Sequence, residues 1–137
     1  MSVPAGQSVP LRHAHGWWGL SALAQIALVI ASTLPLPIEP PGVPHWDKWG
    51  HLLAYVGLTA LGMLVCRTRR GRWLMLGWLL LLGALVEVAQ GLLPWRSMEA
   101  ADLLANAIGV ALGGLVALTP LRDALVWLEG WLQRGHD

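Results

Sequence analysis

Four apolar stretches dominate the sequence, and each is long enough to cross the hydrocarbon core of a membrane as a helix. They are expected at about residues 16–34, 47–66, 73–93 and 98–118. A helix rises about 1.5 Å per residue, so roughly 20 residues cover the ~30 Å of a bilayer core. Only 12% of the 137 residues are charged, about half the share that soluble domains carry. The chain is therefore predicted to be an all-α integral membrane protein.

The connections between these stretches are short, which predicts an antiparallel four-transmembrane-helix bundle. A proline-rich segment ends the first stretch, the basic segment 67–72 follows the second, and Pro94 ends the third. We expect a tail at 1–15, the four-helix domain at 16–119 and a second tail at 120–137. Asp47 is expected to cap the second helix, and Ser97 with Glu99 the fourth.

The basic residues predict the orientation of the bundle, because loops on the cytoplasmic side carry an excess of Lys and Arg. Lys48 and Arg96 lie on one side. The opposite side carries Arg12, Arg67, Arg69, Arg70, Arg72, Arg122 and Arg134. Both termini are therefore predicted to be cytoplasmic in the inner (plasma) membrane. The first stretch could instead be a cleaved signal peptide, but its apolar run exceeds the usual ~7–15 residues, so an anchor is favoured.

The second tail begins with Thr119 and Pro120, a good cap and first-turn pair. One face of the helix that follows is apolar: Leu121, Ala124, Leu125, Leu128, Trp131 and Leu132. This spacing predicts a C-terminal interfacial amphipathic helix on the inner leaflet. A helix that docks on a partner is the alternative.

Polar side chains interrupt three of the four stretches near their outward ends. They are Asp47, Lys48, His51, Glu87, Gln90, Arg96, Asp102 and Asn106. An ionisable group within a membrane segment costs roughly 2.5–3.5 kcal/mol, so their number in one layer predicts that they meet. All except Asp47 are predicted to bind a ligand. His51, Glu87 and Asp102 are also the candidates for catalysis.

Two small residues continue the polar face of the fourth stretch. Asp102 and Asn106 are followed at helical spacing by Gly109 and Gly113. Small residues let helix backbones approach closely in lipid, which predicts a central position for this helix. The cytoplasmic half of the third stretch carries no polar side chain between residues 73 and 86, so a conduction path is disfavoured.

The sequence gives little support to cofactors or to nucleic acid as a partner. Cys66 is the sole cysteine, which excludes a cysteine-based zinc site. His51, Glu87 and Asp102 could form a metal site, but their spacing in the sequence does not resemble HExxH or a similar metal-binding motif. No metal and no cofactor are therefore expected. The basic residues form no patch that would fit nucleic acid.

Three motifs resemble those of the VanZ-like family of small integral membrane proteins. They are Asp47-Lys48-x-x-His51-x-x-x-Tyr55, Glu87-x-x-Gln90 and Arg96-x-x-Glu99-x-x-Asp102-x-x-x-Asn106-x-x-Gly109. The resemblance spans about residues 47–114, and Glu99 stands where Asp would be more usual. It implies a multi-helix membrane protein associated with low-level resistance to glycopeptide antibiotics, notably teicoplanin. It implies no defined reaction.

The predicted function is recognition of an anionic envelope lipid or a lipid-linked cell-wall precursor in an outward-facing pocket. Arg96 can hold a phosphate through two hydrogen bonds, and Lys48 can add a point charge. An intramembrane enzyme is the alternative, with His51 as general acid or base beside Glu87 or Asp102. A purely structural polar network and a small transporter subunit are the remaining alternatives. The sequence leaves the oligomeric state open.

Overall fold

The computed structural model describes residues 9–35 and 45–134, and within these residues it contains helices and no strand. The four long helices are α1 (Ala14–Thr33), α2 (Trp46–Val65), α3 (Arg69–Gly91) and α4 (Ala100–Gly114). The 3₁₀ turn η1 (Leu115–Leu118) extends α4, and η2 (Pro120–Asp123) leads into α5 (Ala124–Arg134). Four helices, the fourth counted to Leu118, are long and apolar enough to cross a membrane. The predicted all-α membrane architecture is confirmed.

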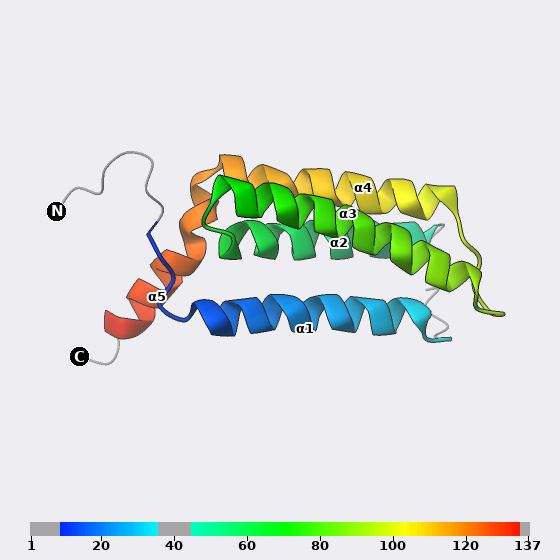
Figure 1. The fold of residues 1–137 in the computed structure, drawn as a ribbon, viewed down its shortest axis with the longest axis horizontal. Helices are drawn as coiled ribbons and strands as arrows, with labels where there is room; N and C mark the ends of the chain where they lie inside the picture. The colour runs from blue at the N-terminus through cyan, green and yellow to red at the C-terminus, as the bar shows by residue number, and fades with distance from the viewer. Residues whose placement is uncertain (1–8, 36–44, 135–137) are drawn as a thin grey trace.

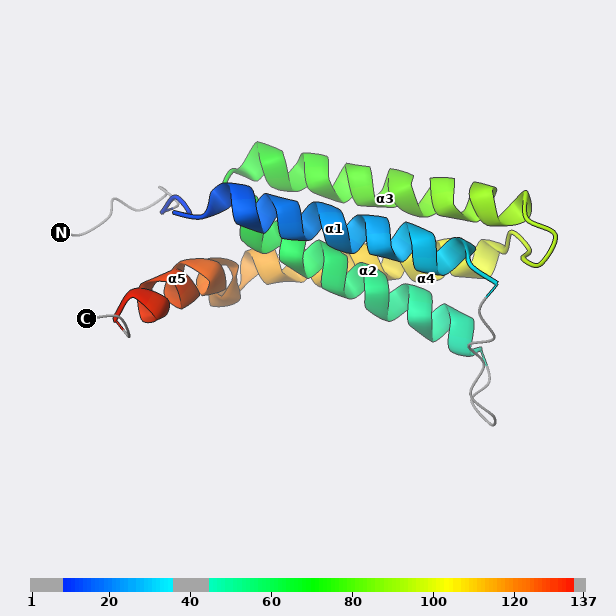
Figure 2. The same ribbon diagram turned by 90° about the horizontal axis from the view of Figure 1, so that it is seen from below.

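The four long helices lie side by side and alternate in direction, as the colours of Figure 1 show. The predicted antiparallel bundle is therefore present. The start of α1 lies at the same end as the end of α4, and α5 leaves the bundle there at an angle (Figures 1 and 2). That this end is cytoplasmic remains a prediction from the arginines.

Helices α2 and α4 approach each other most closely, at two glycines of α4. A Cβ atom on Gly109 would lie 2.7 Å from the carbonyl oxygen of Leu52, and one on Gly113 would lie 2.5 Å from that of Val56. Real Cβ contacts are not this short. The face that the sequence marked with glycines is thus the face on which the two backbones touch.

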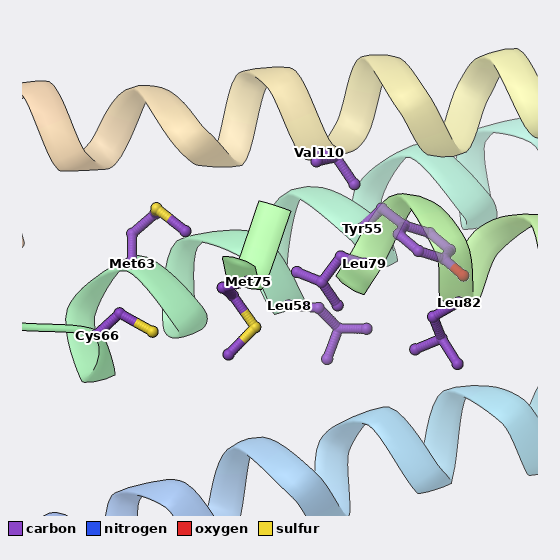
Figure 3. Packing of buried hydrophobic residues seen from close by; sticks show 8 residues of the cluster. All are labelled: Tyr55, Leu58, Met63, Cys66, Met75, Leu79, Leu82 and Val110. Atoms are coloured by element: carbon purple, nitrogen blue, oxygen red, sulfur yellow. The ribbon is translucent and has the colours of Figure 1, made fainter. Parts of the chain in front are cut away.

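Apolar side chains from α2, α3 and α4 fill the middle of the bundle (Figure 3). The cluster consists of Tyr55, Leu58, Met63, Cys66, Met75, Leu79, Leu82 and Val110. Helix α1 packs more loosely, since Ser21 and Ser32 are its only buried residues. Between α1 and α3 lies an apolar groove of about 490 Å³.

Helix α5 contacts the bundle through a face that carries Leu125 and Glu129. Leu125 packs against Leu11 and Val65. The Glu129 carboxylate accepts hydrogen bonds from the backbone N–H of Arg12 (2.9 Å) and His13 (3.0 Å) and from Nε1 of Trp17 (2.8 Å). Backbone N–H groups at the start of a helix have no partner within it, so Glu129 supplies the partners there.

Most of the apolar face predicted for this tail stays exposed. Leu121, Leu128, Trp131 and Leu132 are all exposed, whereas Leu125 is buried. The helix therefore has one side docked on the bundle and another that is apolar and open. Placement of the open side in the inner leaflet remains a prediction.

Replacing Glu129 with glutamine is expected to loosen this contact. Burial raises the pKa of the Glu129 carboxyl, but the hydrogen bonds from Arg12, His13 and Trp17 outweigh it and leave the pKa below its usual value. The ionised form thus adds stability above pH ~4.5 that is lost as the pH falls through the lowered pKa. Glu129→Gln should lower the free energy of unfolding by about 1.5–3 kcal/mol near neutral pH. Thermal unfolding in detergent measures this change. Gln133→Ala on the same helix should change stability by less than about 0.5 kcal/mol, and equal losses would contradict the assignment.

Several helix boundaries differ from the predicted ones. Helix α3 begins at Arg69 and not near 73, because the Thr68 side chain accepts a hydrogen bond from the Gly71 backbone N (3.0 Å) and caps it. Four of the six residues in the basic segment 67–72 are therefore helical. The proline-rich segment 36–44 and the chain ends at 1–8 and 135–137 lie outside the described residues.

Two of the predicted caps are wrong. The residue before α2 is His45, in a left-handed conformation, so Asp47 lies within the first turn. Helix α4 starts at Ala100, after Glu99, whose side chain makes no capping hydrogen bond. The Ser97 hydroxyl instead donates to Oε1 of Glu99 (3.3 Å).

Candidate functional site

The predicted polar residues gather at the end of the bundle where α3 ends and α4 begins. Helix α2 supplies Lys48 and His51, α3 supplies Glu87 and Gln90, and α4 supplies Asp102 and Asn106. Five of them are more than nine-tenths buried: Glu87 (0% exposed), Asn106 (1%), Gln90 (2%), Asp102 (5%) and His51 (7%).

The innermost group joins three helices around His51. Its Nδ1 lies 3.0 Å from Oδ1 of Asn106 and 3.9 Å from Oε1 of Glu87. The other Glu87 oxygen, Oε2, accepts a long hydrogen bond from the backbone N of Glu99 (3.4 Å). One ligand-type atom from each of His51, Glu87 and Asp102 lies within 4.8 Å of the others. The three candidates for catalysis are therefore neighbours in space.

Several buried polar atoms in or next to this layer make no hydrogen bond within the described part of the protein. They are Tyr55 Oη, Thr59 Oγ1, Glu87 Oε1, Gln90 Oε1, Asp102 Oδ1 and Asn106 Nδ2. A buried polar atom without a partner costs about 1–3 kcal/mol. Four of these six atoms belong to predicted site residues, whereas Tyr55 and Thr59 lie further along α2, toward the apolar middle.

Lys48 is surrounded by carboxylates. Its Nζ lies 2.8 Å from Oε2 of Glu99, 3.0 Å from Oδ2 of Asp47 and 3.3 Å from Oδ1 of Asp102. The contact between Lys48 and Asp102 is an ion pair whose geometry is not that of a hydrogen bond. Oδ1 of Asp102 therefore has no hydrogen-bond donor among the described residues. The hydrogen bond from Lys48 holds the pKa of the Glu99 carboxyl below its usual value.

Gln90 and Arg96 lie on the side of the layer that faces α1. Gln90 Nε2 donates to the backbone carbonyl of Ser32 (3.0 Å), and Arg96 donates to the same oxygen from Nε and Nη2 (3.4 Å each). Trp95 Nε1 donates to the carbonyl of Thr33 (3.1 Å). Within residues 9–35 and 45–134, Arg96 forms no ion pair with a carboxylate.

The layer carries more acidic than basic groups. Asp47, Glu87, Glu99 and Asp102 supply four carboxyl groups against the two basic side chains of Lys48 and Arg96. If all four carboxyl groups ionise, the layer has an excess of two negative charges with His51 neutral. A cationic group would balance this excess.

Sequence reasoning did not assign ligand or partner roles to Glu99, Ser32 or Thr59. Glu99 meets Lys48 from 51 positions away, a separation that no local spacing rule covers. Ser32 contributes its backbone carbonyl, which leaves no signal in the side-chain pattern. Thr59 is fully buried on α2, two turns from the predicted residues.

Comparison with protein families identifies a match that covers most of the chain. A family model described as VanZ/LLP1 matches residues 4–122, a segment that contains every predicted site residue. Comparison with curated proteins and with solved structures finds no match.

Proposed function

The chain belongs to the VanZ/LLP1 family, and we propose that it recognises an anionic envelope lipid or a lipid-linked cell-wall precursor at its outward end. Membership fits a membrane protein linked to glycopeptide resistance, and lipid recognition would connect the polar layer to that link. The observation that carries the proposal is the position of Arg96. This guanidinium lies at the edge of the buried polar layer, beside α1, without a carboxylate partner among the described residues.

Arg96 is well suited to be the anion contact. Its two hydrogen bonds to Ser32 are 3.4 Å long, whereas typical N–H···O bonds are about 2.9–3.0 Å. These contacts are weak enough for a phosphate to replace them with two charge-assisted bonds. Lys48 is already neutralised by three carboxylates, so its role in the proposal is to hold the acidic groups in place.

The groove between α1 and α3 would accept the hydrocarbon chain of the lipid. Its lining is almost entirely apolar: Trp18, Ala22, Gln25, Ile26, Val29, Ile30, Met75, Trp78 and Leu82. Leu82 lies about two helical turns before Gln90, and Ile30 lies two residues before Ser32. A chain in the groove would therefore have its headgroup near Arg96.

Replacing Arg96 with alanine is expected to reduce co-purifying anionic lipid by about tenfold or more, since charge-assisted hydrogen bonds contribute about 1.5–3 kcal/mol. Native mass spectrometry of the protein extracted with its lipids measures this loss. Arg70→Ala, an exposed arginine at the other end of the bundle, is the matched control. Unchanged lipid in Arg96→Ala, at equal protein level, would rule the proposal out.

An intramembrane enzyme is the second candidate, favoured by the convergence of His51, Glu87 and Asp102. His51 would transfer a proton, Arg96 would stabilise charge that develops on a phosphate, and water would attack. Liposomes that contain labelled phospholipid, analysed for products by mass spectrometry, separate the two candidates. Products that disappear in His51→Ala while bound lipid remains would select the enzyme. No products from wild type would select recognition alone.

A further inference from the structure

We infer that His51, Glu87 and Asp102 together bind one divalent transition-metal ion of the zinc class. The three side chains come from α2, α3 and α4 and offer one nitrogen and two oxygens within 4.8 Å of one another. Around tetrahedral zinc, with bonds of about 2.0–2.2 Å, ligand atoms lie ~3.3–3.6 Å apart. Small rotations of side chains would bring these three atoms to that spacing.

Unpaired buried oxygens point to the same site. Glu87 is fully buried, its Oε2 is used by the Glu99 backbone N, and its Oε1 has no hydrogen-bond donor in the described part of the chain. That free oxygen lies 3.9 Å from the His51 ring. Oδ1 of Asp102 has no hydrogen bond, and its one charged contact is the 3.3 Å ion pair with Lys48 Nζ. A metal ion between the two carboxylates would give Oε1 of Glu87 the partner that it lacks.

The competing cation, Lys48, is held mainly by two other carboxylates. Its shorter contacts go to Glu99 (2.8 Å) and Asp47 (3.0 Å), and the 3.3 Å contact with Asp102 lacks hydrogen-bond geometry. Lys48 therefore holds Asp102 less tightly than it holds the other two carboxylates. If all four carboxyl groups ionise, the layer's excess of two negative charges equals the charge of one divalent ion.

The donor set favours zinc over calcium or magnesium. Imidazole is a ligand of zinc and other transition metals, whereas calcium and magnesium take oxygen ligands. Three protein ligands leave a fourth position open. On the proposed function, a phosphate oxygen of the lipid would take that position.

Zinc binding to the protein without added lipid tests the inference separately from lipid recognition. The full chain, carrying an affinity tag that contains no histidine, is stripped with a chelator, dialysed against Zn²⁺ and analysed for bound metal by mass spectrometry. We expect one ion per chain. His51→Ala and Glu87→Gln should each weaken binding more than about 100-fold, beyond the loss typical of residues that only contact a metal ligand. Less than a tenth of an ion per wild-type chain would overturn the inference.

Glu129→Gln is the matched control, because it makes the same change at a second buried glutamate of the described residues, at the opposite end of the bundle. It should bind zinc as the wild type does, and equal binding in Glu87→Gln would overturn the site. Should a site variant fail to fold, Co²⁺ added to the wild type gives an independent reading. Visible absorption bands that one equivalent of Zn²⁺ removes support the site, and their absence refutes it.

Discussion

Replacing Gly113 with alanine is expected to force α2 and α4 apart. The added Cβ would lie 2.5 Å from the Val56 carbonyl oxygen, 2.7 Å from the Thr59 Cβ and 3.0 Å from the Ala60 backbone N. Two of these atoms belong to the backbone, so no side-chain rotation relieves the contact. Overpacking of this kind costs about 1–3 kcal/mol or more, a large part of the ~5–15 kcal/mol that stabilises a folded chain.

Thermal unfolding in detergent measures the effect, and Gly57→Ala is its control. Gly57 lies on α2 with nothing within 4 Å of an added Cβ. Alanine there should be neutral or should stabilise the helix by up to about 1 kcal/mol. The two identical substitutions are thus expected to act in opposite directions. If Gly113→Ala is as stable as the wild type, the close approach of α2 and α4 is wrong.

Replacing Lys48 with alanine is expected to destabilise the end of the bundle where α3 ends and α4 begins. It removes the cation that contacts Asp47, Glu99 and Asp102 and leaves their charges to repel one another. Removing one partner of a fully buried ion pair costs about 3–5 kcal/mol. Lys48 is 24% exposed, so a loss of about 1–3 kcal/mol is expected for its pair with the buried Asp102.

Two further measurements distinguish charge from packing. Adding Asp102→Asn to Lys48→Ala should restore part of the lost stability, with a coupling of about 0.5–3 kcal/mol. The pH dependence should change as well. Because Lys48 lowers the pKa of the Glu99 carboxyl, its contribution is present above that group's ordinary value of 4.5 and is lost as the pH falls through the lowered pKa. Lys48→Ala should lack this acid-side loss, and an unchanged acid profile would contradict the pairing.

The pattern of apolar and polar residues was sufficient to predict the helices and the meeting of His51, Glu87, Asp102 and Asn106. Each of these residues interrupts an apolar stretch, and short antiparallel connections leave few ways to satisfy them. The close helix contact at Gly109 and Gly113 could also be predicted, because their spacing continues the polar face of α4. Hydropathy and helical periodicity are properties of a single helix. They are enough to predict where each helix lies and which of its faces is polar or lined with glycine.

Other features depend on which helices become neighbours, and sequence spacing does not contain that information. The three proposed metal ligands come from three helices, so a search for closely spaced motifs gave no support to a metal. The partner of Gln90 and Arg96 is a backbone carbonyl, which any residue type at position 32 would offer. Arginines in a short connection are typical of a loop, yet Arg69, Arg70 and Arg72 belong to the first turn of α3, because Thr68 caps the helix before them.

The contact of Glu129 with the start of α1 has a consequence for the order in which the chain assembles. Helix α1 is synthesised before α5, yet the carboxylate that accepts from the backbone amides just before α1, at Arg12 and His13, belongs to α5. This end of α1 therefore lacks its carboxylate partner until α5 has been synthesised. The other end of α1 gains its contacts earlier, once Gln90 and Arg96 reach the Ser32 carbonyl. The bundle thus closes at these two ends at different stages of synthesis.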